Sequence, residues 1–566
     1  MHTAISRPLS EMPYRVALLG NPNEYPEWSE ERLTLLKESG FNMVQLNIAW
    51  LSRPHDEALN LRDVVTLPGE TESTQTAKRR EDLKRRNAMA KKLGFRTMFH
   101  FGSPFMWRNA ETGDIKIQKG DAWNADPPWF DTENPKLVAH ETALLREFVK
   151  AFPDVDDILI YTYDQDAWQA SEFSHSRLSR GRPLHQRLPK YLQALHKAFS
   201  EARAGKDHIL WWEPWELSAG QVYKCIPELP AAQFGLMLHS NIAEVQISMP
   251  IDVWFRNTAR MCAERGIPVV AEGFFGSATE EIQPLSFPFP RLADEQLVAM
   301  TSVPGVCGVK EYFGVIAGIG DLNLEMIAVR IHDKEGTVSA ALLRKVTERF
   351  GPDQARVIKL CDTLSDAMQL WPWDVSWYAR LAGTANIDHG WNAAAIRGQQ
   401  VETPSWESTR RAHFMKTDDQ RPHPFLLEDV QLRLDVSISK LAGAADLCQE
   451  LATSLTKEED RNRFGQIHSD VVKFLRVSRS YAFHIRETNI AMLLRGDLES
   501  SRPLTAHLIE EMKSVLQADA ENQEKRGVVM ERLKQFEAEP AGFVKQWLLP
   551  LDKDIREKGI FSLTTR

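Results

Sequence analysis

Carboxylic side chains follow four short apolar runs in the first part of the chain, each close to an aromatic residue. Asp164 and Asp166 follow one run, and Glu213, Glu272 and Glu311 follow three later ones. A buried carboxylate is costly unless it is paired, and several that lie together push each other's pKa values apart. General acid–base chemistry needs such a difference. The pattern therefore predicts a site at which one carboxyl group gives a proton while another acts as base or nucleophile.

Each of these carboxylates also has a structural interpretation. Asp164 or Asp166 could cap a following helix, Glu213 could bond loop backbone, and Glu311 follows a lysine with which it could form an ordinary ion pair. Glu272 fits a solvated charge less well, because it directly follows an apolar run and precedes Gly-Phe-Phe-Gly. Among these carboxylates, Glu272 is therefore the strongest candidate for a functional role.

Aromatic and polar side chains at the same run ends are expected to complete the site. Aromatic rings give a binding pocket its flat apolar surface, and a few polar groups orient the ligand. A single tryptophan or histidine is more typical of a core, but the sequence Trp-Trp-Glu-Pro-Trp cannot easily bury all its rings. The expected substrate-binding residues are Asn47, Trp50, His100, Trp107, Trp168, Trp212, Glu213, Phe274, Glu311 and Tyr312.

Eight short apolar runs are expected to be the strands that position these residues. They are residues 15–20, 42–50, 96–102, 157–163, 208–212, 234–239, 267–271 and 306–309, with 244–249 as an alternative sixth strand. Such runs are typical of strands buried on both faces, and charged stretches with helical periodicity separate them. The alternation favours a closed (β/α)8 barrel, in which the carboxyl ends of all strands meet at one rim. An open doubly wound sheet is the alternative, but no Gly-x-Gly-x-x-Gly follows an early strand.

With Asp164-Gln-Asp166 after its fourth run and Glu272 ending its seventh, the chain resembles the (β/α)8 glycoside hydrolases. The resemblance covers roughly residues 1–330, and residues 171–199 are similar to a stretch of hexosaminidase-like and α-glucuronidase-like barrels. It implies cleavage of a glycosidic bond, with Asp166 as general acid, Asp164 holding it or exchanging roles, and Glu272 as nucleophile or base. The chain departs from the commonest Asn-Glu motif after strand four, and it lacks the Asp-Glu pair of substrate-assisted hexosaminidases.

Two other functions stay open at this point. A sugar isomerase or lyase on the same barrel would bind Mg²⁺ or Mn²⁺ through oxygen-rich ligands drawn from Asp164, Glu213, His239, Glu272 and Glu311. A carbohydrate-binding barrel without catalysis would keep the aromatic residues and lack a productive carboxylate pair. For the hydrolase itself, neither a metal nor a cofactor is expected.

The chain of 566 residues is long enough for two domains, and its second part reads differently from the first. We expect the barrel over residues 1–335 and an all-helical domain over 336–566, where apolar residues recur at spacings of three and four. This helical domain is expected to buttress the barrel. Alternatively it could mediate homo-oligomerisation, or cover the pocket as a lid with Trp371, Trp373 and Trp377.

Bulk properties narrow the partners and the compartment. The net charge of −9 disfavours a nucleic-acid partner, and no apolar run approaches the length of a membrane span. The five cysteines are scattered without a Cys-x-x-Cys pair, which disfavours a disulfide framework or a structural zinc site. No signal-peptide pattern follows Met1, so we expect a cytoplasmic protein whose partner is a carbohydrate.

Overall fold

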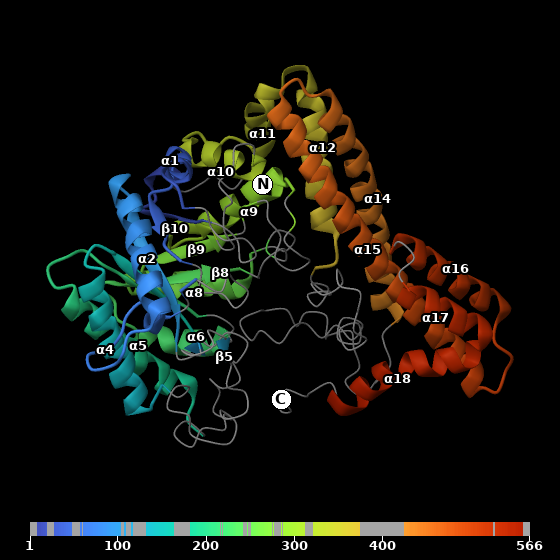
Figure 1. The fold of residues 1–566 in the computed structure, drawn as a ribbon, viewed down its shortest axis with the longest axis horizontal. Helices are drawn as coiled ribbons and strands as arrows, with labels where there is room; N and C mark the ends of the chain where they lie inside the picture. Colours follow the sequence, from blue (N-terminus) through green and yellow to red (C-terminus); the bar gives the residue numbers. More distant parts are fainter. Residues whose placement is uncertain are drawn as a thin grey trace.

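The structure analysed is a computed structural model of the chain. It describes residues 8–19, 28–47, 57–58, 60–103, 107–108, 115–116, 132–162, 181–214, 217, 219–240, 246, 251–273, 275–276, 285, 287–311, 321–373, 424–523 and 527–558. These residues form a barrel of strands surrounded by helices, and a long helical arm that leaves the barrel on one side (Figure 1).

Eight parallel strands close into a barrel. They are β1 (Tyr14–Leu18), β2 (Met43–Gln45), β3 (Arg96–Gly102), β6 (Asp157–Tyr161), β7 (Leu210–Glu213), β8 (Phe234–His239), β9 (Val269–Gly273) and β10 (Val306–Glu311). Their order around the ring is β1-β10-β9-β8-β7-β6-β3-β2. The predicted (β/α)8 barrel and its eight strands are confirmed, including residues 234–239 as the sixth strand. A separate antiparallel pair joins β4 (Trp107–Arg108) to β5 (Ile115–Lys116).

Side chains alternate along each strand between the barrel lumen and the surrounding helices. The lumen holds a compact apolar layer, made by Val16, Met43, Met98, Leu159, Trp211, Met237 and Val270. Trp211 is its largest member, and Gly235 on the next strand makes room for it: a Cβ at that glycine would lie 2.4 Å from the indole ring. The alternate residues of the strands pack outward in a second, larger core.

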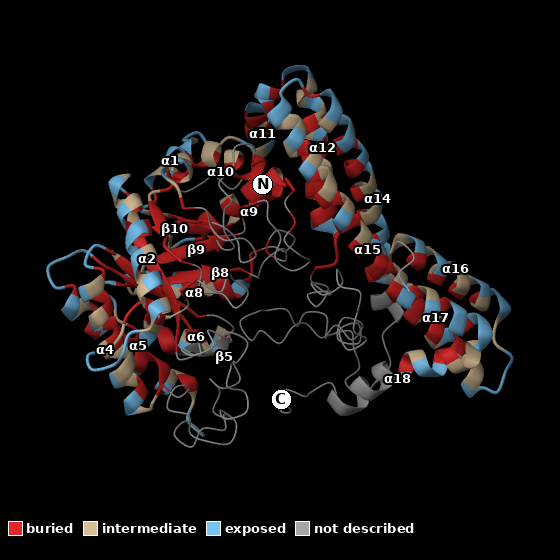
Figure 2. Cartoon of the chain, viewed as in Figure 1, coloured by how far each residue is buried: buried red, intermediate tan, exposed pale blue. Residues whose placement is uncertain are grey.

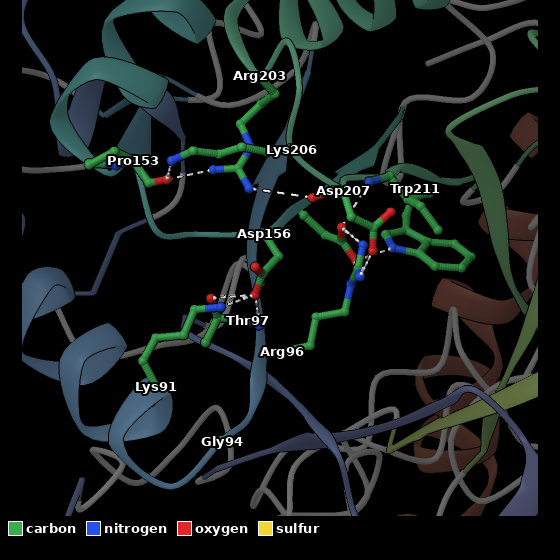
Figure 3. A network of polar contacts seen from close by, with 12 residues as sticks. Lys91, Gly94, Arg96, Thr97, Pro153, Asp156, Arg203, Lys206, Asp207 and Trp211 are labelled. Carbon is green, nitrogen blue, oxygen red and sulfur yellow. Dashed lines mark hydrogen bonds and ion pairs between the residues drawn. The ribbon is translucent and has the colours of Figure 1, made fainter.

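An ionic network closes the amino-terminal end of the barrel, below the apolar layer. Arg96 donates to both oxygens of Asp157, through Nε at 2.8 Å and Nη2 at 2.6 Å. Trp211 Nε1 and the Ile209 N–H donate to the same carboxylate at 3.0 and 2.8 Å. Figure 3 shows Arg96 reaching between Trp211 and Asp207, with which it also forms an ion pair. Burial works to lower the pKa of Arg96, yet the bonds and charges of the two aspartates hold it above its ordinary value.

Helices cover the outside of the barrel, with their buried faces toward the strands and their exposed faces outward (Figure 2). They are α1 (Glu30–Glu38), α2 (Thr74–Lys92), α4 (Pro135–Ala151), α5 (Leu188–Ala202), α6 (Ala219–Cys225), α8 (Val253–Glu264), α9 (Pro290–Thr301) and α10 (Leu322–His332). Several begin where a short polar side chain accepts a bond from the first turn. The N-caps of this kind are Ser29, Ser73, Asn134, Asp252 and Asp321.

The second part of the described chain is helical, as predicted. It comprises α11 (Ser339–Thr347), α12 (Gln354–Leu370), α14 (Pro424–Ser454), α15 (Glu458–Glu499), α16 (Ala506–Asn522), α17 (Gly527–Ala538) and α18 (Pro540–Lys558). Helices α12, α14 and α15 lie side by side, and α16–α18 gather around the end of α15 (Figure 1). None of the helices in the described part of the chain combines the length and the apolar character that crossing a bilayer requires.

The helical arm is joined to the barrel through a shared core. Phe287, which precedes α9, stacks on Phe474 of α15 with ring centroids 5.5 Å apart. Trp371 and Trp373 are fully buried there: Trp371 Nε1 donates to Ser478 Oγ at 3.0 Å, and Trp373 Nε1 donates to a carbonyl of α12. The alternative in which these two tryptophans form a lid is therefore wrong, because their rings pack between helices and do not cover a pocket. Trp377 lies outside the described residues.

Candidate active site

Polar side chains fill the lumen one layer above the apolar plug, toward the carboxyl ends of the strands. The alternation of each strand puts them there, since each follows a lumen residue by two positions. We call this set the polar layer; its members are Gln45, His100, Glu213, His239, Glu272 and Lys310. All six are buried, and they come from six different strands. The polar layer thus lies at the rim where barrel enzymes carry out their chemistry.

Glu272 and Lys310 form an ion pair in the polar layer. They are paired residues of the neighbouring strands β9 and β10, and Lys310 Nζ lies 2.6 Å from Glu272 Oε1. Both side chains are completely buried. Burial alone would lower the pKa of Lys310, but the carboxylates of Glu272 and Glu213 raise it above its ordinary value. The other carboxylate oxygen, Oε2 of Glu272, has no hydrogen-bond partner among the described residues.

His100 and Glu213 meet elsewhere in the same layer. His100 Nε2 lies 3.6 Å from Glu213 Oε2, although β6 separates their two strands. The amide nitrogen of Gln45 donates to the carbonyl of Asn47 at 2.7 Å and lies 3.2 Å from His100 Nδ1. Since this nitrogen is a donor, Nδ1 accepts, and in a neutral imidazole the ring proton is then on Nε2, facing Glu213.

His239 adds an uncharged imidazole to the layer. It is paired with Glu272 in the register of β8 and β9. Burial, and then the positive charge of Lys310, lower its pKa to about 3. The ring is therefore neutral at physiological pH and adds no charge to the polar layer.

Two residues expected to bind substrate make hydrogen bonds to backbone. Asn47 Oδ1 accepts from the His100 N–H at 2.8 Å, and its Nδ2 donates to the His100 carbonyl at 2.7 Å. Glu311 Oε2 accepts from the N–H groups of Phe275 and Gly276 at 3.0 and 3.1 Å. Asn47 thereby fixes the backbone of β3 at His100, and Glu311 fixes the backbone that follows Glu272. Glu311 points away from the Lys310 side chain, because consecutive residues of β10 face opposite ways.

Trp212 was expected to offer a stacking surface, and its position corrects that expectation. Its side chain is fully buried in the outer core, and Nε1 donates to Thr162 Oγ1 at 3.2 Å. Trp211 takes the lumen position, so Trp212 points toward the surrounding helices. Both rings of this pair are buried, whereas Trp215 of the same segment lies outside the described residues.

The other expected site residues divide into two groups. Glu272, Glu213 and His100 come together in the polar layer. Asp164, Asp166, Trp50, Trp168, Phe274 and Tyr312 lie outside the described residues, and for Trp107 only the backbone, in β4, is described.

Three members of the polar layer were given no such role from the sequence. Gln45 was not considered, Lys310 was considered as an ion-pair partner of Glu311, and His239 was considered as a metal ligand. Each follows an apolar or glycine lumen residue by two positions on its strand. That spacing is the signal that could have identified them.

The metal-dependent alternative needs several ligands close together. In the part of the chain that the structure describes, no three His, Cys, Asp or Glu side chains gather as a metal site would require. Lys310 also neutralises Glu272, which that alternative needs as a ligand.

No protein-family model and no curated protein matches the sequence. Solved structures do match, at low identity. A GH138 enzyme that targets pectin rhamnogalacturonan II is 11% identical, with a TM-score of 0.53 over 91% of this chain, which spans 62% of that enzyme's length. An O-GlcNAc hydrolase variant from Thermobaculum terrenum is 10% identical, with a TM-score of 0.40 over 96% of this chain and 95% of that one. A β-N-acetylhexosaminidase is 9% identical, with a TM-score of 0.40 over 60% of this chain and 76% of that one. The chain therefore has a (β/α)8-barrel fold, which it shares with the GH138 enzyme, followed by a helical C-terminal region.

Proposed function

We propose that this chain is a glycoside hydrolase whose Glu272 acts as nucleophile or base on a sugar bound at the carboxyl-terminal rim. One observation carries the proposal: Glu272 is fully buried, Lys310 holds one of its oxygens, and the other has no hydrogen-bond partner among the described residues. Buried polar atoms in folded proteins are nearly always hydrogen-bonded. An oxygen left with its lone pairs available suits attack on an anomeric carbon or removal of a proton from a water molecule.

The second carboxyl group is proposed to come from the segment after β6. In the ring, β6 stands three places from β9, so a sugar between them would be flanked by Glu272 and by Asp164 or Asp166. Asp166 would protonate the leaving oxygen, with Asp164 holding it or exchanging roles. The glycosidic C–O bond then breaks as Glu272, or the water it deprotonates, bonds to the anomeric carbon.

The remaining residues are proposed to bind the sugar. Glu213, in contact with His100, would accept hydrogen bonds from hydroxyl groups at the lumen side. Aromatic residues of the rim segments would stack on the sugar faces: Trp50, Trp107, Trp168, Phe274 and Tyr312. Asn47 and Glu311 would act indirectly, through the backbone that they fix.

The domain division is proposed as residues 1–335 for the barrel and 336–566 for the helical domain. The shared core around Phe287, Phe474 and Trp371 supports a buttressing role for the helical domain. A carbohydrate is the proposed partner, and self-association through the helical domain is the second role proposed for it.

The test is hydrolysis by the full chain of a panel of aryl glycosides and oligosaccharides. The panel should include pectic oligosaccharides and N-acetylhexosaminides, because the structural neighbours act on such sugars. We expect Glu272→Gln to lower kcat/KM by about a thousandfold or more on the substrate found. Glu264→Gln is the matched control, since Glu264 makes only an exposed ion pair with Arg260, and should retain full activity. A folded Glu272→Gln variant with undiminished activity would refute the proposal.

A further inference from the structure

We infer that Lys310 is a positioning residue of this site: its ammonium group keeps Glu272 ionised and selects Oε2 as the reacting oxygen. The inference rests on the proposed function of Glu272 and concerns how that carboxylate is kept ready. It assigns to Lys310 an action through Glu272, with no contact to the substrate required.

Lys310 and Glu272 form a direct ion pair between neighbouring strands. Nζ lies 2.6 Å from Oε1, and strand pairing sets the two residues side by side. On the other side of β10, the residue paired with Lys310 is Val16 of β1, which is apolar. Both charged side chains are completely buried, so each depends on the other for most of the stabilisation of its charge.

The charges that act on Lys310 come from β9, β7 and its own strand β10. Glu272 of β9 is in contact with it, and Glu213 of β7 and Glu311 of β10 act on it through space. His239 of β8 stays neutral, so it adds no second cation to this region. Three carboxylates thus act on one ammonium group, and Glu272 is the one that it bonds.

Removing the cation would leave a buried carboxylate without a partner. Such a group is unstable as an anion and takes up a proton instead. A protonated Glu272 could neither attack a carbon nor deprotonate water. Lys310 also occupies Oε1, which leaves Oε2 as the oxygen with available lone pairs.

The same surroundings argue against a nucleophilic amine at this position. A lysine that forms a Schiff base needs an accessible, neutral amine, favoured by a low pKa. Here the neighbouring carboxylates raise the pKa of Lys310 despite its burial, so the side chain stays an ammonium.

The kinetic test compares Lys310→Met, which removes the charge, with Lys310→Arg, which keeps it. On the substrate found for the wild type, the acid limb of the kcat/KM profile should move up by about one pH unit or more in Lys310→Met. Its kcat should fall by about a hundredfold at the lower pH values, with KM changed less than about threefold. Lys310→Arg should keep the acid limb near its wild-type position.

The control Lys334→Met changes an exposed lysine and should leave kcat, KM and the acid limb unchanged. An unmoved acid limb in a folded Lys310→Met variant overturns the inference.

A second readout needs no activity, so it separates this inference from the proposed function. Protein labelled with ¹³C at glutamate Cδ gives a carboxyl signal that Glu272→Gln identifies by its loss. In the wild type this signal should be that of a carboxylate at neutral pH, and in Lys310→Met that of a carboxylic acid. Wild type without hydrolase activity refutes the proposed function while this titration still decides the role of Lys310. A carboxylate signal in both proteins overturns the inference.

If Lys310→Met does not fold, the double variant Lys310→Met/Glu272→Gln decides. A buried pair of uncharged groups avoids the unpaired charge. The double variant should therefore fold and show a cooperative thermal unfolding transition. A double variant that also fails to fold would show that Lys310 matters for packing alone, and would overturn the inference.

Discussion

His100 and Glu213 lie in contact in the barrel lumen, with Nε2 of the imidazole 3.6 Å from a carboxylate oxygen, although their strands are not neighbours. Gln45 holds the far side of the ring and directs the ring proton toward Glu213. The ring in turn is held by the strand that Asn47 fixes. A carboxylate so oriented is suited to binding a substrate hydroxyl group in one defined position.

Glu213→Gln is therefore expected to weaken binding more than turnover. The amide keeps the shape and loses the charge, so we expect KM to rise about tenfold while kcat changes less than about threefold. Steady-state kinetics on the substrate found in the panel give both values. A fall of kcat as large as that of Glu272→Gln would instead place Glu213 among the catalytic residues.

The roles proposed for Asp164 and Asp166, the two aspartates that follow β6, can be distinguished by varying the leaving group of the substrate. A general acid matters most when the leaving oxygen is a poor leaving group and least when it is a dinitrophenolate. Asp166→Asn should lower kcat/KM on an alkyl glycoside about a hundredfold more than on the dinitrophenyl glycoside of the same sugar. Asp164→Asn should lower both by similar factors, since it is proposed to hold Asp166. The opposite pattern would exchange the two roles.

Burial of Glu141 on α4 predicts a loss of stability with rising pH. Burial raises its pKa to about 7, although Arg62 and a hydrogen bond from Ser103 work to lower it. The unfolded chain gives up this proton near pH 4.5, so the folded state loses stability as the pH rises from about 4.5 to 7. Glu141→Gln should remove this loss, on the order of 2 kcal/mol for a partly exposed residue. Thermal melts between pH 4.5 and 8 measure it.

The control for this prediction is Glu201→Gln, at an exposed position of α5. It should leave the pH dependence of the melting temperature as it is in the wild type. If Glu141→Gln shows the wild-type dependence too, the loss arises elsewhere in the chain.

The network at the amino-terminal end of the barrel predicts a large effect on stability and none on chemistry. Asp157 is fully buried and accepts four hydrogen bonds, from Arg96, Trp211 and the Ile209 backbone. Arg96→Met leaves this carboxylate without its cation and should cost about 3–5 kcal/mol of unfolding free energy. Denaturant titration measures the loss, and kcat/KM per folded molecule should not change. Asp207→Asn, at the exposed side of the same arginine, should cost less than about 1 kcal/mol.

The strands could be predicted from the sequence, because runs buried on both faces have a near-continuous apolar character that few other segments share. All eight were found this way, from residues 15–20 to residues 306–309. The sequence could not predict which of two consecutive residues on a strand faces the lumen. Either Trp211 or Trp212 could have faced the lumen, and only the closed barrel, with Gly235 beside Trp211, decides between them.

The same limit explains the outcome for the candidate site. Lys310 and Glu311 are adjacent in sequence and face opposite ways, so the ion pair expected between them is made by Lys310 with Glu272 instead. The backbone bonds of Asn47 depend on β2 and β3 lying together, which no local pattern encodes. Trp371 and Trp373 resemble surface aromatics in sequence, and only their neighbours on α15 show them to be core.

The apolar layer of the lumen separates two charged networks, the polar layer above and the Arg96 network below. Three of its members are methionines, and Trp211 fills much of the remaining space. A close-packed apolar layer of this kind leaves no room for water or mobile ions, so protons do not pass through it from one network to the other. A proton that reaches Glu272 is therefore expected to arrive from the carboxyl-terminal side of the barrel.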